Sequence, residues 1–337
     1  MRVRDPRFWA VVALRGSVGA GESFMAGDWS ADDLVAVVRL LVRNRAALER
    51  LDGGLSRLAL PLLRLHHRLR RNDRDGARRN IAAHYDLGND FYRLWLDETL
   101  TYSAGLFAAD GATLADAQTA KLERICAKLD LRPGLRVVEI GTGWGSFALH
   151  AAGRHGCHVT TTTISREQHR VATERVRAAG LEERVTVVMQ DYRDLQGTYD
   201  RLVSIEMIEA VGHDFLDAYF AACARLLADD GLACIQAITI ADRHHAEALR
   251  GVDFIQRHIF PGCSIPSVGS MTASISRATD LTVTNLEDIG LHYAATLRAW
   301  RRRFLAALPE VRRQGFDERF QRMWEFYLAY CEGGFLE

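Results

Sequence analysis

A regular alternation of apolar and amphipathic segments between residues 117 and 240 constrains the fold of this chain more than any other feature. The apolar segments expected as strands are LRVVEI (135–140), HVTTTTI (158–164), VTVVMQ (185–190), RLVSIEMI (201–208) and GLACIQAITI (231–240). The segments expected as helices span 117–131, 146–156, 166–180 and about 214–228. Because parallel strands are joined by crossover helices, this order predicts an α/β fold with a doubly wound, mostly parallel, Rossmann-like sheet.

The regions before and after this core differ from it in composition and in expected secondary structure. Residues 1–79 are expected to form a small helical, basic N-terminal domain with its linker, and 80–337 the larger domain. Apolar residues recur at helical spacing in 34–51 and again in 55–71, before the polar run 72–80. The segment 241–337 mixes helices with a loop at Pro261-Gly262 and is a candidate to complete the sheet and the wall of a pocket.

The charge is balanced overall but uneven along the chain. Formal net charge is zero, yet twelve arginines lie between Arg39 and Arg79 against four acidic residues. Such a local excess suits an anionic surface, either lipid or nucleic acid, and it equally suits a solvated helix face.

The spacing of the cysteines and the hydropathy of the chain indicate the cellular compartment in which we expect the protein. The six cysteines are scattered without CxxC spacing, so neither a disulfide framework nor a metal site is expected. A reducing cytoplasm is the expected location. The N-terminus lacks a signal pattern, and no apolar run approaches the roughly 20 residues of a transmembrane helix. Any contact with lipid is therefore predicted to occur at the membrane surface.

The stretch VVEIGTGWGS (137–146) predicts a cofactor site. A buried strand ends in Glu139, and Gly141, Gly143 and Gly145 form the turn into the next helix, where backbone can approach a ligand. Glycine turns of this kind also bind dinucleotides. However, the acidic residue precedes the glycines, and the next strand ends in TTTTIS without the acidic ribose ligand of nicotinamide sites. These details favour S-adenosylmethionine (SAM).

QDYRDL (190–195) follows the third predicted strand and supports the same interpretation. An amide, a carboxylate and an aromatic ring at a strand end suit an adenine. Asp191 alone is more typical of a helix cap, but in register with the glycine turn Gln190 and Asp191 become predicted cofactor contacts.

A long segment and seven motifs that follow it occur in the order found in a known family. They are NIAAHYDLGNDFYRLWLDETLTYSAGLF (80–107), EIGTGWG, TISREQ, QDYRD, SIEMIEAVGH, VDFIQRHIFPG with LHYAATLRAW, and FYLAYCEGGF. In these motifs, and in GSVGAGESFMAGDW (16–29), the chain resembles the cyclopropane-fatty-acyl-phospholipid synthases, which include the mycolic-acid methyltransferases. The resemblance implies a class I methyltransferase sheet, SAM as cofactor, and methyl transfer to the double bond of a phospholipid acyl chain at the inner face of the membrane. It also suggests a homodimer.

The resemblance also assigns residues. The implied cofactor contacts are Tyr102, Ser103, the Gly141–Gly145 turn, Thr163, Gln168, Gln190 and Asp191. Members of the family hold bicarbonate as a base in a cage that includes a cysteine, a glutamate, a histidine and a tyrosine. The glutamate matches Glu209 and the tyrosine matches Tyr293, while Cys331 fits the YC element of the family's tail.

The sequence departs from the family pattern at the cage. The cysteine position is Ala104, the histidine position is Gln236, and the residue after Glu209 is Ala210. Gln236 can still donate an amide hydrogen bond to a bicarbonate oxygen, so Glu209, Tyr293, Gln236 and Cys331 are the predicted catalytic residues. The altered cage leaves two products open, a cyclopropane and a methyl-branched, methylene-branched or furan-pathway chain.

Three other functions compete with lipid methylation. Small-molecule N-methyltransferases share this ancestry but typically keep a histidine where Ala210 stands. A nucleic-acid methyltransferase could use the arginines, but no recognition module accompanies them, so no nucleic-acid partner is expected. A scaffold that binds the cofactor without turnover is disfavoured by the intact cofactor motifs and Glu209.

Overall fold

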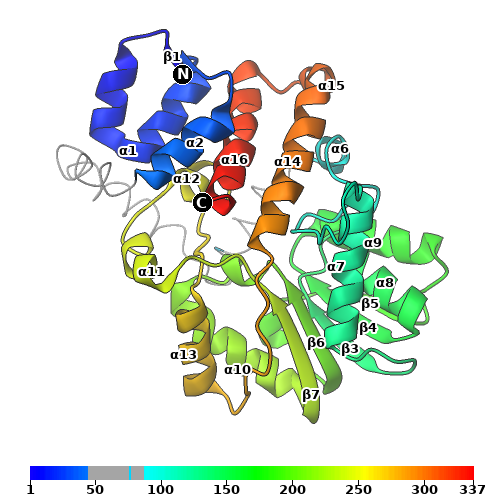
Figure 1. The fold of residues 1–337 in the computed structure, drawn as a ribbon. Coiled ribbons are helices and arrows are strands. Elements are labelled where there is room, and N and C mark those ends of the chain that lie inside the picture. Colours follow the sequence, from blue (N-terminus) through cyan, green and yellow to red (C-terminus); the bar gives the residue numbers. More distant parts are fainter. Residues whose placement is uncertain (45–75, 77–86) are drawn as a thin grey trace.

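The central sheet has the predicted architecture. The computed structural model describes residues 1–44, 76 and 87–337 (Figure 1). The strands of the sheet are β3 (Arg136–Ile140), β4 (His158–Thr163), β5 (Val185–Met189), β6 (Tyr199–Ile205) and β7 (Leu227–Gln236). Their order is β5-β4-β3-β6-β7, and every neighbouring pair is parallel. The predicted doubly wound parallel sheet is confirmed.

Helices cover both faces of the sheet because alternate strand residues point to opposite sides. The helices that flank it are α7 (Leu114–Lys128), α8 (Ser146–His155), α9 (Arg166–Ala178), α10 (Leu216–Leu226) and α13 (Val268–Ala278). Val137 packs in one apolar cluster with residues of α7 and α8. Its neighbour Val138 packs in another cluster with residues of α10 and α13.

The N-terminal helices pack on the C-terminal ones. Short strands β1 (Arg2–Val3) and β2 (Trp29–Ser30) pair beside α1 (Arg7–Ala26), and α2 (Leu34–Arg43) follows. Figure 1 shows α16 (Glu318–Phe335) between these helices and α14 (Gly290–Ala306), and it contacts all three. A Cβ atom on Gly333 would lie 2.6 Å from Val38 Cγ1, so glycine allows α16 and α2 to approach closely.

The predicted boundary at residue 79, the helix at 55–71 and most of the arginine-rich stretch lie outside the described residues. The helical character predicted for the N-terminal region is confirmed for α1 and α2. None of the helices within the described ranges combines the length and apolar character needed to cross a bilayer.

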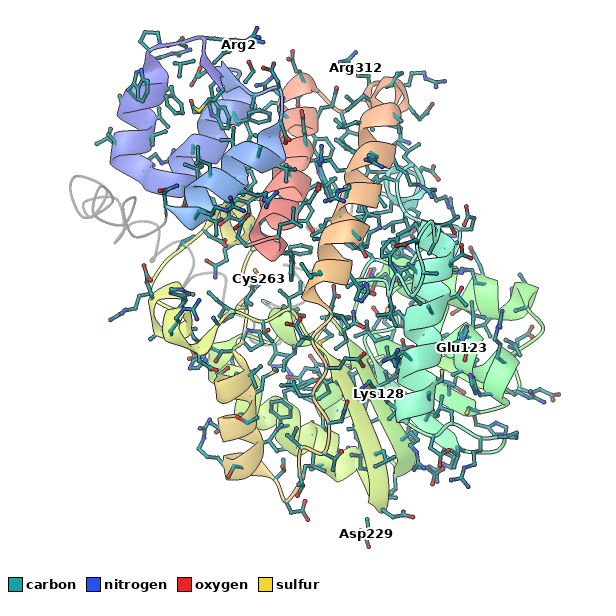
Figure 2. The ribbon with its side chains drawn as sticks, viewed as in Figure 1. Arg2, Glu123, Lys128, Asp229, Cys263 and Arg312 are labelled. Atoms are coloured by element: carbon teal, nitrogen blue, oxygen red, sulfur yellow. The ribbon has the colours of Figure 1, made fainter. Side chains whose placement is uncertain are left out.

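One prediction about the C-terminal segment is wrong. Residues 237–337 are all described and add no strand to the sheet. They form α11 (Asp242–Ala248), α12 (Phe254–His258), α13, α14, α15 (Leu308–Arg313) and α16 with intervening loops. The extended stretch 279–289 is tied to α7 by side chains instead, since Glu287 pairs with Arg124 at 2.5 Å and with Lys128 at 2.9 Å. Figure 2 labels Lys128 on α7.

Candidate active site

A cavity opens at the carboxyl ends of β3, β4 and β6, with about 1110 Å³ of free space, part of it open to solvent. The strand order reverses between β3 and β6, and ligands of open α/β sheets bind at such a switch point. Nine of the ten predicted cofactor residues line it: Tyr102, Ser103, Glu139, Gly141, Gly143, Thr163, Gln168, Gln190 and Asp191. The tenth, Gly145, is the N-cap of α8, directly before the lining residue Ser146.

The glycine turn has a conformation that requires glycine. Gly141, Gly143 and Gly145 have φ angles of +101°, +51° and +89°, in the region that side chains disfavour. A Cβ atom on Gly143 would meet no atom within 4 Å, so this glycine borders open space in the cavity. The neighbouring Thr142 hydroxyl is buried and has no hydrogen-bond partner among the described residues. The turn thus offers backbone and a free hydroxyl to a polar ligand.

Glu139 is one of three carboxylic residues that line the cavity, with Asp191 and Glu206. It is 2% exposed, and Thr161 Oγ1 donates a 2.6 Å hydrogen bond to its Oε2. Burial raises the pKa of this carboxyl to about 8, which a bound cation would counteract. The carboxylate therefore suits a positively charged ligand.

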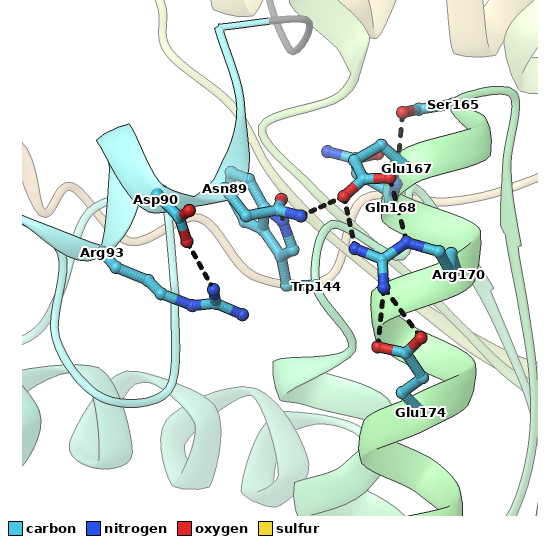
Figure 3. A network of polar contacts seen from close by, with 9 residues as sticks. All are labelled: Asn89, Asp90, Arg93, Trp144, Ser165, Glu167, Gln168, Arg170 and Glu174. Atoms are coloured by element: carbon cyan, nitrogen blue, oxygen red, sulfur yellow. Dashed lines mark hydrogen bonds and ion pairs between the residues drawn. The ribbon is translucent and has the colours of Figure 1, made fainter. Parts of the chain in front are cut away.

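A polar network holds the segment around α6 (Asn89–Arg93) against the cofactor turn (Figure 3). The indole nitrogen of Trp144 donates to Asn89 Oδ1 at 2.7 Å, and the amide of Asn89 donates to Glu167 in the first turn of α9. Arg170 holds Glu167 and Glu174 on the same helix. Asn89 was not predicted as a site residue, because its role depends on α6 and α9 meeting in space.

Asp191 caps a short helical turn at the cavity, and its predicted contact with the cofactor stays a prediction. It lines the cavity, and its side chain accepts from Arg193 N at 3.0 Å, which caps a short helical turn. The guanidinium of Arg193 also pairs with it at 2.7 Å. The neighbouring Gln190 donates to Asp194 O at 2.8 Å, so both side chains at this strand end are fixed in place.

Glu206 is a half-buried carboxylate on the wall of the cavity, and the sequence interpretation missed it. Its Oε1 accepts from Ala104 N and from Gln236 Nε2, both at 2.8 Å. Its Oε2 accepts from the Tyr293 hydroxyl at 2.8 Å. The residue follows β6 with φ +49°, a conformation that costs a non-glycine residue energy and that is typical of functional sites.

The hydrogen-bond donors around Glu206 and the burial of its carboxyl have opposite effects on its pKa. Burial raises the pKa of its carboxyl, and the donors from Ala104, Gln236 and Tyr293 oppose that rise. Lys121 of α7, also buried, lines the same cavity and donates to Ser103 Oγ at 2.8 Å. Burial lowers the pKa of Lys121 to about 8 although Glu206 and other carboxylates raise it. Lys121 is a second wall residue that the sequence interpretation missed.

The predicted catalytic residues are only partly brought together. Tyr293 and Gln236 meet at Glu206, whereas Glu209 is turned toward the backbone of Ile238, which donates to its Oε1. Oε2 of Glu209 is buried without a hydrogen-bond partner in the described part of the chain, and burial raises its pKa to about 8. The structure thus joins Gln236 and Tyr293 to Glu206, three residues earlier, and not to Glu209. The predicted catalytic role of Glu209 stays a prediction.

Cys331 lies on α16 within the aromatic core, packed among the same helices as Tyr293. Burial raises the pKa of its thiol, so it is a neutral group there. No hydrogen bond among the described residues joins it to Glu206. Its predicted catalytic role stays a prediction.

The fold and the cavity define a class. A parallel sheet with a glycine turn after its first strand, a buried acidic residue on that strand and an amide–carboxylate pair after the third form a cradle for SAM. Glu139 and the free Thr142 hydroxyl suit its charged amino-acid end, and Gln190 and Asp191 its adenosine. The protein is a class I SAM-dependent methyltransferase.

Comparison with known proteins then gives the family. Residues 72–337 match the family model described as mycolic acid cyclopropane synthetase, and the chain belongs to this family. It is 41% identical to tuberculostearic acid methyltransferase of Mycobacterium tuberculosis over 96% of this chain and 77% of that protein. It is 37% identical to cyclopropane-fatty-acyl-phospholipid synthase of Escherichia coli K12, over 99% of this chain and 84% of that one.

Solved structures agree. A mycolic acid cyclopropane synthase complexed with SAH and CTAB superposes with a TM-score of 0.72 at 32% identity, over 77% of this chain and 93% of that one. Coclaurine N-methyltransferase reaches a TM-score of 0.70 over 94% of this chain and 93% of that one. At 23% identity this second likeness concerns the fold alone.

Proposed function

We propose that this chain transfers the methyl group of SAM to a double bond in an unsaturated acyl chain of a membrane phospholipid, and that Glu206 accepts the released proton. The observation that carries this proposal is the half-buried Glu206 carboxylate, held at the cofactor cavity by three donors from separate parts of the chain. The E. coli relative, which is named for its action on phospholipid acyl chains, supports the choice of substrate.

The residues around the cavity suit a reaction that passes through a carbocation. SAM supplies an electrophilic methyl group, and the alkene carbon that receives it leaves a cation on the adjacent carbon. Tyr102 lines the cavity and packs on Trp300 with 5.3 Å between ring centroids; Tyr293 lies 6.1 Å from the same ring. Aromatic faces stabilise cations. A cavity wall that excludes water prevents water from reacting with the carbocation.

Glu206 fits the role of base because its carboxylate fills the space between the cage positions of the family. Two of the residues that depart from the family pattern, Ala104 and Gln236, donate to the same carboxylate oxygen. Tyr293, which matches the family tyrosine, donates to the other oxygen. The proposal therefore assigns to a side chain the task that bicarbonate performs elsewhere in the family, and bicarbonate is not required.

Two different products can form without any reactant other than SAM and the acyl chain. If Glu206 takes a proton from the transferred methyl group directly, the methyl carbon bonds to the cationic carbon and closes a three-membered ring. If a hydride first shifts from the methylated carbon to the cationic carbon, loss of a methyl proton gives a methylene branch. A saturated methyl branch needs an additional hydride donor. The likeness to tuberculostearic acid methyltransferase favours the open-chain outcome.

A basic cleft favours an anionic phospholipid as the substrate over an acyl chain on a neutral carrier. A second cavity, with about 500 Å³ of space partly open to solvent, lies between α2, α14 and α16, and its wall includes Arg39, Arg298, Arg301 and Arg302. Its two acidic residues, Asp33 and Glu332, leave positive charge in excess. Arg302 is exposed and pairs with no carboxylate of the described chain. Guanidinium groups bind phosphate well because their donors match its oxygens.

The adjoining surface of α2 suits a lipid interface. Leu40 is 61% exposed and Leu41 39%, and they lie between Arg39 and Arg43 in sequence. Apolar side chains flanked by arginine favour the boundary between headgroups and acyl chains. This arrangement supports the expected action at a membrane surface.

The proposal is tested by incubating the protein with vesicles of monounsaturated phosphatidylglycerol and SAM carrying a trideuterated methyl group. Released fatty esters are then analysed by mass spectrometry before and after hydrogenation. Two retained deuteriums in a product that resists hydrogenation indicate ring closure; two in a reducible product indicate a methylene branch. Failure to label any unsaturated lipid, with the cofactor shown to bind, contradicts the proposed substrate.

A further inference from the structure

Four potential metal ligands gather between α7 and α8, apart from the cavity. Glu123 and Cys126 lie three residues apart on α7, so they share one face of that helix. His150 and His155 lie on α8, which packs against α7. Figure 2 labels Glu123 at this contact between the helices. None of the four residues lines the cofactor cavity.

The donor atoms are close enough to share one ion. A ligand atom from each of Cys126, His150 and His155 lies within 4.8 Å of the other two. Glu123 adds a carboxylate, with Oε1 2.9 Å from His150 Nε2 and Oε2 3.1 Å from His155 Nε2. Ligand atoms around a tetrahedral zinc ion are roughly 3.5 Å apart, given metal–ligand bonds of about 2.0–2.3 Å. Small side-chain rotations reach that spacing.

The imidazole of His150 lies with the other donors of the cluster at the contact between the two helices. Its side chain is 9% exposed, and Nε2 is enclosed by protein. Glu123 Oε1 is its ion-pair partner when the imidazole is protonated, and the two groups can instead share one metal ion. Cys126, 1% exposed, closes the inner side of the cluster.

We propose that Glu123, Cys126, His150 and His155 form a binding site for a divalent transition-metal ion, and that Zn²⁺ fits it best. One thiolate, two imidazoles and one carboxylate are ligand types that zinc accepts in tetrahedral sites, whereas Mg²⁺ and Ca²⁺ require oxygen donors. All four protein ligands would be used, which is typical of a structural site. Arg154 approaches Glu123 Oε1 at 3.7 Å, but its side chain is 66% exposed and free to turn into solvent.

Such an ion would join two helices that also form the cofactor cavity. Lys121 and Leu122 of α7, directly before Glu123, line that cavity, and α8 begins at the glycine turn with Ser146. Metal binding would therefore stabilise α7 against α8 and the cavity wall with them. The site escapes motif searches because its ligands are divided between two helices and lack CxxC or HxxxH spacing.

The test uses the full chain, purified without a metal-affinity step and treated with a chelator. Zn²⁺ is added and the bound metal is measured by mass spectrometry after gel filtration, with Mg²⁺ as the comparison ion. We expect one Zn²⁺ per chain, no retained Mg²⁺, and a rise in Tm of at least about 3 °C. Absence of stoichiometric zinc, or an unchanged Tm, would overturn the proposal.

Cobalt substitution identifies the ligands. Co²⁺ bound here should give the intense visible bands of tetrahedral coordination and a thiolate-to-cobalt charge-transfer band in the near ultraviolet. Cys126→Ser should remove the charge-transfer band, whereas Cys223→Ser, at another buried cysteine on α10, should keep it. If Cys126→Ser does not fold, His150→Gln and His155→Gln must each change the visible bands. A charge-transfer band that survives in Cys126→Ser contradicts the assignment.

Discussion

The two halves of the active site are built in different ways. The cofactor half is made of short contiguous motifs at neighbouring strand ends, such as the glycine turn and the pair Gln190–Asp191. The half that holds Glu206 draws single residues from four distant parts of the chain, at positions 104, 206, 236 and 293. The first half is shared by the methyltransferase class, whereas the second departs from its own family's pattern. Binding and proton removal should therefore be separable by mutation.

The largest effect is expected for Glu206→Gln. The amide is nearly isosteric but cannot accept the proton, so turnover on unsaturated phospholipid should fall by about 10²–10⁴-fold. The dissociation constant for SAM, measured by calorimetry, should change by less than about twofold. Turnover near the wild-type rate would show that the base lies elsewhere and that the comparison of the two halves is wrong.

The reverse pattern is expected for Glu139→Gln. Loss of the carboxylate removes a charge-assisted contact with the cofactor, worth about 1.5–3 kcal/mol, so SAM binding should weaken by roughly 10–100-fold. Turnover at saturating SAM should stay close to that of the wild type, measured with the same vesicles. If turnover falls while SAM binding is preserved, Glu139 belongs to the reaction and the two halves are not separate.

A smaller effect is expected at the basic cleft. Arg302→Ala should raise the KM for anionic phospholipid vesicles by about fivefold, since one basic residue near an anionic surface contributes about 1 kcal/mol. High salt should reduce the difference. Arg319→Ala, another exposed arginine near the start of α16, is the matched control. If both variants raise the KM equally, the cleft has no specific role in binding the phospholipid.

The smallest effect concerns stability at Glu209. Its folded pKa of about 8 exceeds the usual 4.5, so the folded state binds more protons than the unfolded state between these values. The carboxyl therefore lowers stability as pH rises through this window. In Glu209→Gln, the loss of Tm between pH 5 and pH 8 should be smaller than in the wild type, measured by calorimetry. An identical pH dependence would show that Glu209 is not buried as described.

Sequence reasoning recovered the cofactor half and the sheet because both depend on local patterns. Strand periodicity and the glycine turn can be recognised in contiguous residues. The positions of Glu139, Gly141 and Asp191 at the strand ends follow directly from these patterns. Glu206 could not be located in this way, because its partners come together only when β6, β7 and α14 pack. One local signal existed: SIEMIE carries a second acidic residue at the strand end. The expected sheet completion after residue 240 failed because side chains, not a backbone ladder, fix residues 279–289.

The central claim is that Glu206 takes the place of bicarbonate, and chemical rescue tests it most directly. Turnover is measured in degassed buffer and again with added bicarbonate, for the wild type and for Glu206→Ala. The wild type should be indifferent to bicarbonate, while the variant, with space opened beside Ala104, Gln236 and Tyr293, should be nearly inactive and partly restored by the anion. A wild type that needs bicarbonate for turnover would contradict this account.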